Sequence, residues 1–320
     1  MRDRFQREID YIRISVTDKC NFRCRYCMPE EGVETIPHSE VLSFEEIVRV
    51  VSVLSELGIK KVKITGGEPL VRRDICTLIQ KIAKISGIED ITLTTNGFLL
   101  GEMAEQLKRA GIRTINVSVD TLNRREFADI CRRDGLDQVL DSIERAKNLG
   151  LEIRINTTVS EESNLEELFE LLEYFVNRDI PVRFIELMPI GCGHGSRVKN
   201  QDLQKMLKKR YPDFVRSNFS GNGPAVYYTF GKNKKVGFIS AVHNKFCESC
   251  NRIRLSCDGK IKPCLASSLS YDIKTVLRSG GDDKKLKESL EQAIFYKPLE
   301  HHFGKEKSEC IKNTMNQIGG

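Results

Sequence analysis

The chain has 320 residues, 40% hydrophobic and 30% charged, which are ordinary values for a globular protein that buries a large core in one barrel-like domain or in two domains. Its opening stretch MRDRFQREIDYIRIS lacks the apolar run of a signal peptide, and no stretch approaches the ~18 apolar residues of a transmembrane helix. We therefore expect a cytoplasmic protein with no membrane partner. The net charge of +6 is not concentrated in one run and no recognition motif accompanies it, so we expect no nucleic-acid partner.

The first 190 residues alternate β-branched runs with helical periodicity. Six segments are strand-like: Tyr11–Thr17, Lys61–Thr65, Ile91–Thr95, Thr114–Asp120, Glu152–Val159 and Val182–Glu186. Between them apolar residues recur at three- and four-residue spacing, as in FEEIVRVVSVLSELG and LDQVLDSIERAKNLG, and both of these segments close with glycine. Successive β-α units of this kind predict a parallel sheet, either doubly wound or barrel-like.

The alternation of side chains along the strands favours the barrel. Four strands have one apolar face and one polar face, whereas a doubly wound sheet is covered by helices and should be apolar on both faces. The polar faces carry Arg13 and Ser15, then Lys61, Lys63 and Thr65, then Asn116, Ser118 and Asp120, and finally Arg154 and Asn156. Because six strands are fewer than the usual eight, we predict an α/β fold with a partial, open (β/α)6 TIM-like barrel.

The eleven cysteines indicate metal binding, because clustered cysteines in a reducing compartment more often bind metal than form disulfides. Six of them form two triplets. The other five are interpreted as single buried or surface thiols: Cys76, Cys131, Cys192, Cys257 and Cys310.

The first triplet, Cys20-x3-Cys24-x2-Cys27, follows the first strand directly, at the carboxyl end of the barrel where such folds build active sites. Three thiolates can hold three irons of a [4Fe–4S] cluster and leave the fourth iron open to chelate an amino-acid head group. The alternatives are a zinc site, which ordinarily needs four ligands, and a chance spacing.

Small hydrogen-bonding residues follow the next strands, in Gly66-Gly67-Glu68-Pro69, Thr94-Thr95-Asn96-Gly97 and Ser118-Val119-Asp120, and together they indicate a cofactor pocket. With its CxxxCxxC loop and GGEP motif, this region resembles the radical S-adenosylmethionine (SAM) superfamily, in which the GGEP segment meets the methionyl amino group. The resemblance implies Cys20, Cys24 and Cys27 as cluster ligands. It also implies four SAM contacts: Tyr26, Gly67, Ser118 and Met188.

The β-α pattern breaks at GCGHG, so we expect two domains, 1–190 and 191–320, the second a smaller α+β unit. In it we expect helices near 201–209, 272–277 and 284–295, strands near 225–230 and 235–240, and a hairpin turning at Asp258-Gly259. A polar tail ends at Gly319-Gly320, and a frayed end is the interpretation that these residues favour.

The second triplet, Cys247, Cys250 and Cys264, spans that hairpin, and Cys257 offers a four-cysteine zinc ribbon as the alternative. A two-residue turn would pair Cys257 with Lys260 and set Cys264 opposite Ile253, roughly 13 Å from Cys257 along the strand. We therefore favour a second three-cysteine cluster, whose open iron would suit a substrate with a nitrogen or oxygen donor.

Basic residues on the inward faces predict an anionic substrate. They are Arg13, Lys61, Lys63, Arg154, Arg183, Arg252 and Arg254. Against them stand three acids, Glu68, Asp120 and Glu186, which could neutralise only some of the charge. Because buried cations are costly unless they meet anions, the surplus suggests a polyanion such as a triphosphate.

The chain as a whole resembles one family of the superfamily, the GTP 3′,8-cyclases, which carry out the first step of molybdenum cofactor biosynthesis. The resemblance runs through YIRISVTDKCNFRCRYCMP, KITGGEPLVRRD, TTNG, SVDTL, VRFIELMPIG, CESCNRIRLSCDGKIKPCL and the terminal Gly-Gly. It implies two [4Fe–4S] clusters, the second held by Cys247, Cys250 and Cys264 and binding guanine. It also implies a GTP site lined by Arg13, Lys63, Thr94, Arg154, Arg252, Ile253 and Arg254.

By the same resemblance, the 5′-deoxyadenosyl radical from SAM removes the 3′ hydrogen of GTP, and the ribose radical attacks C8. The product passes to cyclic pyranopterin monophosphate synthase, and the terminal glycines enter the active site. Lys63 stands where the family commonly has arginine and Arg154 where it has lysine, which leaves the Lys63 contact open. The electron donor is not specified and a homodimer is left open. Two alternatives remain: another radical SAM enzyme with an auxiliary cluster, such as a peptide-modifying maturase, and a zinc and nucleic-acid binding protein.

Overall fold

The computed structural model describes residues 1–193, 198–219, 221–301, 303 and 314–319, and Cys310 and Gly320 lie outside the described residues. Six parallel strands run side by side in chain order, each in register with the next. They are β1 (Tyr11–Ser15), β2 (Lys61–Thr65), β3 (Asp90–Thr95), β4 (Thr114–Ser118), β5 (Glu152–Val159) and β6 (Val182–Glu186).

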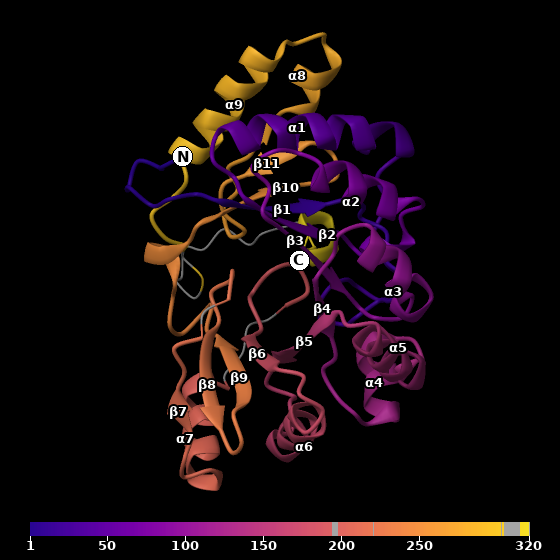
Figure 1. Ribbon diagram of the computed structural model, residues 1–320, viewed down its shortest axis with the longest axis vertical. Helices are drawn as coiled ribbons and strands as arrows, with labels where there is room; N and C mark the ends of the chain where they lie inside the picture. The colour runs from indigo at the N-terminus through magenta and orange to yellow at the C-terminus, as the bar shows by residue number, and fades with distance from the viewer. Residues whose placement is uncertain (194–197, 220, 302, 304–313, 320) are drawn as a thin grey trace.

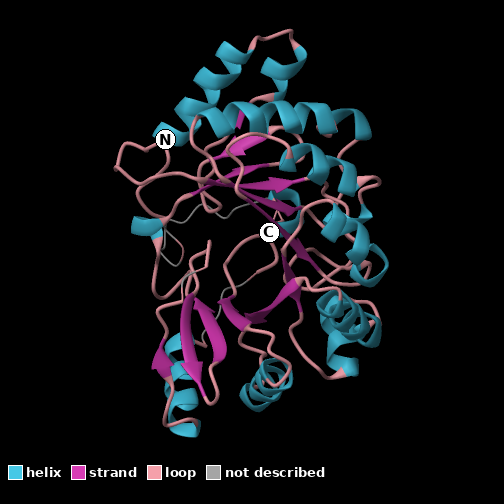
Figure 2. Cartoon of the chain, viewed as in Figure 1, coloured by secondary structure: helices cyan, strands magenta, loops and turns pink. Residues whose placement is uncertain are grey.

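Helices connect these strands and cover the outer face of the curved sheet, while its inner face is left open (Figures 1 and 2). They are α1 (Phe44–Glu56), α2 (Ile75–Ala83), α3 (Leu100–Arg109), α4 (Arg124–Cys131), α5 (Leu136–Asn148) and α6 (Leu165–Val176). Short 3-10 turns η1 (His38–Glu40) and η2 (Pro69–Val71) lie in the first two connections. The partial barrel predicted from side-chain alternation is confirmed as an α/β fold with a parallel sheet.

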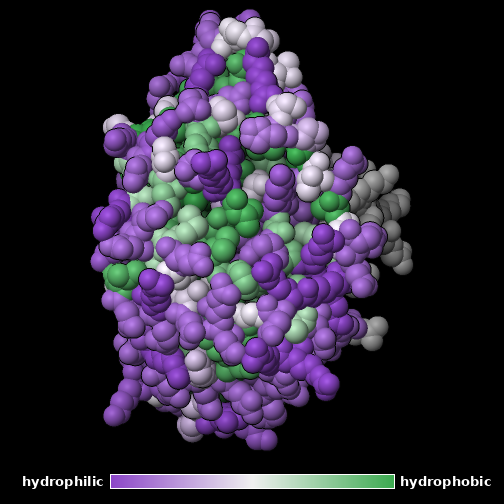
Figure 3. Space-filling view, turned by 90° about the vertical axis from the view of Figure 1, so that its right-hand side faces the viewer, coloured by the Kyte–Doolittle hydropathy of each residue, from purple (hydrophilic) through white to green (hydrophobic). Residues whose placement is uncertain are grey.

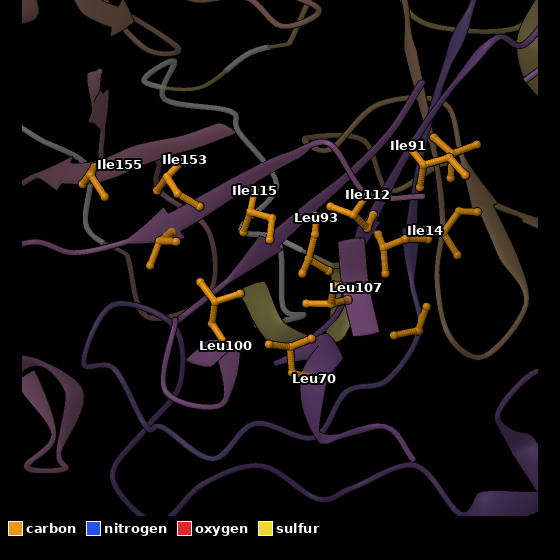
Figure 4. Close-up of a cluster of buried hydrophobic side chains, with 14 of the residues drawn as sticks. Ile14, Leu70, Ile91, Leu93, Leu100, Leu107, Ile112, Ile115, Ile153 and Ile155 are labelled. Atoms are coloured by element: carbon orange, nitrogen blue, oxygen red, sulfur yellow. The ribbon is translucent and has the colours of Figure 1, made fainter. Parts of the chain in front are cut away.

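The hydrophobic core lies between the outer face of the sheet and the helices. Ile14, Leu93 and Ile115 are fully buried there and gather around Leu100 and Leu107 of α3 (Figure 4). Burying each such side chain contributes about 1.5–3 kcal/mol, and only one face of each strand can do so because side chains alternate. The opposite face is thereby left for polar residues.

Glycine follows the ends of α1 and α5, the helices predicted from FEEIVRVVSVLSELG and LDQVLDSIERAKNLG. Ser43 and Glu46 form a capping box at the start of α1, and Gly58 follows its end at φ +92°. Gly150 follows α5 at φ +81°. Glycine reaches this left-handed conformation without the strain that a Cβ adds, so both helices stop where the sequence predicts.

The C-terminal region adds strands to both edges of the same sheet. β9 (Lys234–Ile239) pairs in parallel with β6, and β10 (Arg252–Leu255) pairs in parallel with β1. The outermost strands are antiparallel: β7 (Val215–Arg216) and β8 (Val226–Phe230) beyond β9, and β11 (Lys260–Lys262) and β12 (Tyr271–Asp272) beyond β10. The expected second unit thus shares a twelve-stranded sheet with the barrel. Its helical elements are α7 (Asn200–Arg210), η3 (Cys247–Ser249), α8 (Lys274–Arg278), α9 (Asp283–Phe295) and α10 (Met315–Ile318).

The hairpin between β10 and β11 corrects one expectation. Arg254 pairs with Lys262 and Leu255 with Ile261, so the loop at 257–259 has three residues and not two. Gly259 adopts φ +81°, and the Lys260 amide donates to Ser256 Oγ at 3.0 Å, as in a hairpin closed by a bulge. The extra residue shifts the register by one, so the predicted pairing of Cys257 with Lys260 and of Cys264 with Ile253 is wrong.

No helix in the described part of the chain is long and apolar enough to cross a membrane. The face that carries α2 to α5 is mostly hydrophilic, with hydrophobic side chains gathered near its middle (Figure 3).

Candidate active site

A cavity of about 670 Å³ lies on the inner face of the sheet, and both cysteine triplets open onto it. All four predicted SAM contacts line it, as do all the predicted GTP contacts except Ile253. Ile253 is fully buried and faces away, because its neighbours Arg252 and Arg254 point inward and side chains alternate along β10. Only the main chain of Ile253 could therefore contact a substrate in the cavity.

The first cysteine loop is held in place by packing and backbone turns. Phe22 is buried with its ring edge-on to Phe98 and Phe127, at 5.6 and 5.9 Å between centroids. The Cys27 amide donates to the Cys24 carbonyl at 2.9 Å, which turns the chain between the two cysteines. Burial raises the pKa of the Cys20 thiol to about 12 and that of Cys27 well above its usual range, so iron would have to displace protons at both.

Gly67 lets the segment after β2 approach this loop closely. Its amide donates to the Thr17 carbonyl at 2.6 Å, and a Cβ on Gly67 would lie 2.4 Å from the Lys19 carbonyl oxygen. Only glycine fits such a contact. This fit places the GGEP segment directly beside the predicted cluster ligands.

Glu68 is buried beside that segment and accepts three hydrogen bonds. Its Oε1 accepts from the Thr95 hydroxyl at 2.7 Å and the Leu70 amide at 3.0 Å, and its Oε2 accepts from the Asn96 amide at 2.7 Å. Burial raises the pKa of Glu68 to about 7 even though these bonds oppose the shift. Its carboxyl is therefore poised to titrate near neutral pH.

Tyr26, Ser118 and Met188 lie on the side of the cavity formed by β4, β5 and the segment after β6. The Tyr26 hydroxyl donates to Asp120 Oδ2 at 2.6 Å, and the Thr158 amide donates to Asp120 Oδ1 at 2.7 Å. Burial raises the pKa of Asp120. Asp120 thus fixes the cysteine loop to the ends of β4 and β5.

The second triplet lies where β10 begins and β11 ends. The Cys250 amide donates to the Cys247 carbonyl at 3.1 Å, and Lys297 ties the two strand ends together by donating to the carbonyls of Arg252 at 2.8 Å and Pro263 at 2.6 Å. Burial alone would raise the pKa of Cys250, but the cations Arg252 and Lys297 reverse this and set it at about 6. A thiolate at neutral pH is the form that binds metal.

Cys257 lies apart from this triplet. It is fully buried in the hairpin loop, its carbonyl accepts from the Leu42 amide at 2.8 Å, and it is absent from the cavity lining where Cys264 stands. Among the described residues, no three His, Cys, Asp or Glu side chains converge as ligands of a single metal ion. A four-cysteine zinc ribbon would need Cys257 as its fourth ligand, and the position of Cys257 away from the cavity lining argues against that role.

Cations gather in the middle of the cavity. Burial and the neighbouring Arg183 and Arg13 lower the pKa of Lys63 well below its usual range, and Lys63 makes no ion pair with any carboxylate in the described ranges. Burial also lowers the pKa of Arg13 to about 10. A single bound anion would stabilise the charged form of each of these cations and so oppose the lowering of their pKa values.

Arg183 marks where that anion would fit. It is buried and donates to Oδ1 of Asn116 and, at 2.5 Å, to Oδ1 of Asn156, whereas its buried Nε has no hydrogen-bond partner among the described residues. Within the part of the chain that the structure describes, Arg154 forms an ion pair only with Glu152, at 3.4 Å. An unsatisfied buried donor among cations fits a phosphate oxygen.

Other predicted charges do not take part. Lys61 is absent from the cavity lining and forms an ion pair with Asp10 at 2.7 Å. Glu186 accepts from the amides of Val242 at 3.0 Å and His243 at 3.1 Å. None of the three acids expected to neutralise the cations does so within the described residues, which leaves the surplus larger than the sequence suggests.

The sequence patterns missed the residues of the C-terminal tail. α10 enters the cavity, where Met315 and Asn316 line the wall and Asn316 Nδ2 donates to the Asp18 carbonyl at 3.0 Å. The Gly319 carbonyl accepts from Arg254 Nη1 at 2.5 Å, and Figure 1 shows this end of the chain beside β1 and β2. The signal was present, because Thr314 and Gln317 form a capping box that predicts a helix start.

Comparison with known proteins agrees with this site. Residues 14–175 match the model of the radical SAM superfamily, and residues 180–303 match that of Molybdenum Cofactor Synthesis C. GTP 3′,8-cyclases of Syntrophomonas wolfei and Desulforamulus reducens are each 43% identical over the full length of both chains. The chain belongs to the GTP 3′,8-cyclase family. This identity confirms the predicted radical SAM enzyme of molybdenum cofactor biosynthesis and decides against the peptide-modifying alternative.

Solved structures show the same fold at low identity. Streptococcus suis SuiB bound to its precursor peptide SuiA has a TM-score of 0.62 at 15% identity, covering 98% of this chain and 71% of that one. SuiB bound to S-adenosylmethionine has a TM-score of 0.60 at 17% identity, covering 86% and 66%. Membership of the radical SAM superfamily implies a [4Fe–4S] cluster and SAM, and the family name implies GTP as substrate.

Proposed function

We propose that this chain converts GTP to (8S)-3′,8-cyclo-7,8-dihydroguanosine 5′-triphosphate in one cavity between two iron–sulfur clusters. The observation that carries the proposal is that both cysteine triplets line a single cavity. The basic residues in the middle of this cavity outnumber the acidic residues that could neutralise them. Cys20, Cys24 and Cys27 hold the first cluster, and Cys247, Cys250 and Cys264 hold the second. When bound, the first cluster and SAM supply a 5′-deoxyadenosyl radical.

The protein residues position SAM at the first cluster. Gly67 allows close approach of the main chain to the cysteine loop, and Glu68 accepts a hydrogen bond from the methionyl amino group. Tyr26, Ser118 and Met188 border the remainder of the molecule along the ends of β4 and β6. The buried walls exclude water from the radical.

GTP lies between the triplets, with its guanine toward Cys247, Cys250 and Cys264 and its triphosphate on the cations. Arg13, Lys63, Arg154 and Arg183 neutralise the phosphates, and Arg252 and Arg254 lie beside the second triplet. Thr94 and the main chain of Ile253 complete the contacts. This placement brings the 3′ hydrogen of the ribose toward SAM, and the product passes to cyclic pyranopterin monophosphate synthase.

The test is a turnover assay on anaerobically reconstituted protein with SAM, GTP and dithionite. We expect 5′-deoxyadenosine to form only when GTP is present, together with a cyclised nucleotide seen by mass spectrometry. Cys24→Ser should abolish both products, and Cys76→Ser, on α2 and away from the cavity, should keep them. Equal SAM cleavage with and without GTP, and no cyclised nucleotide, would contradict the proposal.

A further inference from the structure

The N-terminal segment holds a buried arginine against the second cysteine triplet. Arg7 and Asp3 are both buried and form an ion pair at 2.6 Å. Arg7 Nη1 also donates to the Cys247 carbonyl at 2.8 Å, a contact between residues 240 positions apart. A buried charge is stable only when it is paired and hydrogen-bonded, and this guanidinium meets both conditions.

The Cys247 carbonyl that Arg7 contacts is the one on which the cysteine turn is built. It also accepts from the Cys250 amide at 3.1 Å, and this bond closes the 3-10 turn η3 between the two cysteines. A carbonyl oxygen has two lone pairs and can accept both donors. Because η3 has only three residues and buries none of them, it has little of its own to hold it, and Arg7 supplies a fixed point.

The same guanidinium reaches the chain that follows α9. Arg7 Nη1 donates to the Leu299 carbonyl at 2.8 Å, and Nη2 donates to the Pro298 carbonyl at 2.7 Å. We call residues 297–299 the frame segment. One side chain thus joins the N-terminal segment, the cysteine turn and the frame segment.

Lys297, the first residue of the frame segment, ties the other two cysteines to it. Its ammonium donates to the Arg252 carbonyl at 2.8 Å, two residues after Cys250. It also donates to the Pro263 carbonyl at 2.6 Å, directly before Cys264. The frame segment is therefore joined to the surroundings of every cysteine in the second triplet.

The first cysteine loop is anchored elsewhere. The amide of Arg23 donates to the Cys131 carbonyl at 3.0 Å, and the amide of Arg25 donates to the Ile130 carbonyl at 2.9 Å, both at the end of α4. Across the ranges that the structure describes, no hydrogen bond joins Arg7 to that loop. A change at Arg7 should therefore affect one triplet and not the other.

We propose that Arg7 is a positioning residue for the second cluster, which holds the turn that carries Cys247 in the shape that presents this thiolate to the cavity beside Cys250 and Cys264. It acts through main-chain carbonyls and is not itself a ligand. Groups that orient ligands in this way commonly change metal affinity by about 10- to 100-fold when they are removed. The inference rests on the proposed function only in assigning the second cluster to these cysteines.

The experiment uses two full-length proteins that each keep one cysteine triplet. The second-cluster protein carries Cys20→Ser, Cys24→Ser and Cys27→Ser, and the first-cluster protein carries Cys247→Ser, Cys250→Ser and Cys264→Ser. Each should hold about four irons per chain after anaerobic reconstitution, as one [4Fe–4S] cluster requires. Release of iron to excess chelator is followed by the loss of visible absorbance.

We expect Arg7→Gln to speed iron release from the second-cluster protein about ten-fold and to leave release from the first-cluster protein unchanged. The electron paramagnetic resonance spectrum of the reduced second-cluster protein should also change shape, because the geometry at one ligand has changed. The matched control is Arg2→Gln, which removes the same charge from an exposed position of the same segment and should alter neither protein.

A second variant and a cluster-free measurement cover the case in which Arg7→Gln binds no iron. Asp3→Asn keeps Arg7 but weakens its anchor, and it should speed release from the second-cluster protein alone, by a smaller factor. In cluster-free protein with all its cysteines, alkylation by iodoacetamide is followed by peptide mass spectrometry. We expect Cys247 to react several-fold faster in either variant than in wild type, because the loosened turn exposes its thiol, and Cys27 to react at the wild-type rate.

Iron release that Arg7→Gln speeds equally in both proteins, or in neither, would overturn the inference. Equal alkylation of Cys247 in wild type and variants would do the same. A second-cluster protein that binds no iron with Arg7 intact would instead overturn the proposed function, and the alkylation rates would still decide whether Arg7 holds the cysteine turn.

Discussion

At the scale of single residues, Glu68 couples the site to pH. Glu68 is 1% exposed, and burial raises the pKa of its carboxyl to about 7 from its ordinary value of 4.5. The folded state therefore binds more protons than the unfolded state between these values, and the free energy of unfolding falls as pH rises through that window.

We expect the free energy of unfolding of cluster-free wild-type protein to fall by about 2 kcal/mol between pH 5 and pH 7, relative to Glu68→Gln. Urea unfolding at both pH values measures the difference. The exposed Glu288→Gln on α9 serves as the control and should follow the wild type. If the difference in the free energy of unfolding between wild type and Glu68→Gln is the same at both pH values, burial does not raise the pKa of Glu68.

Lys297 is a second residue whose effect follows from its contacts. It is 2% exposed, and its ammonium satisfies the carbonyls of Arg252 and Pro263. Lys297→Met keeps the shape but leaves both acceptors without this donor, so we expect a loss of about 2 kcal/mol or more in the free energy of unfolding. Chemical unfolding of the cluster-free protein measures it, with the exposed Lys284→Met on α9 as control. Equal stability of the two variants would mean that water replaces the ammonium.

At the scale of elements, the hairpin between β10 and β11 determines which cysteine reaches the cavity beside Cys247 and Cys250. The three-residue loop buries Cys257 under Leu42 and leaves Cys264 on the cavity wall. The prediction from sequence also preferred Cys264 to Cys257, but it used a strand register that is wrong by one residue. The loop length cannot be predicted from Asp258-Gly259 alone. What it read correctly was that an intervening turn keeps the two cysteines apart.

We therefore expect Cys257→Ser to keep about eight irons per chain, as two [4Fe–4S] clusters require, and Cys264→Ser to lose part of them. Iron and acid-labile sulfide determinations on reconstituted protein give the count. The reverse pattern would move the ligand from Cys264 to Cys257.

At the scale of the whole molecule, the sequence predicts the six strands of the barrel well but does not predict which strands pair with its two edges. The strands from Tyr11 to Glu186 follow from alternation, because one face of each must meet helices and the other a polar interior. The pairing of β10 with β1 and of β9 with β6 does not follow, since alternation reports which face is buried and not which strand lies alongside. For the same reason the cations were predicted to face inward, but the ion pair of Lys61 with Asp10 and the burial of the tail under Arg254 depend on contacts between distant segments.

The pairing of β1 with β10 also sets the order in which the molecule can be completed during its synthesis. Tyr11 lies against Arg252, 241 positions later, so one edge of β1 has no partner until the ribosome has made nearly all of the chain. At the usual pace of translation that interval lasts on the order of ten to fifty seconds. An unpaired strand edge favours association with other chains, so the nascent barrel needs protection over that interval, before the second cysteine triplet can take its place beside the first.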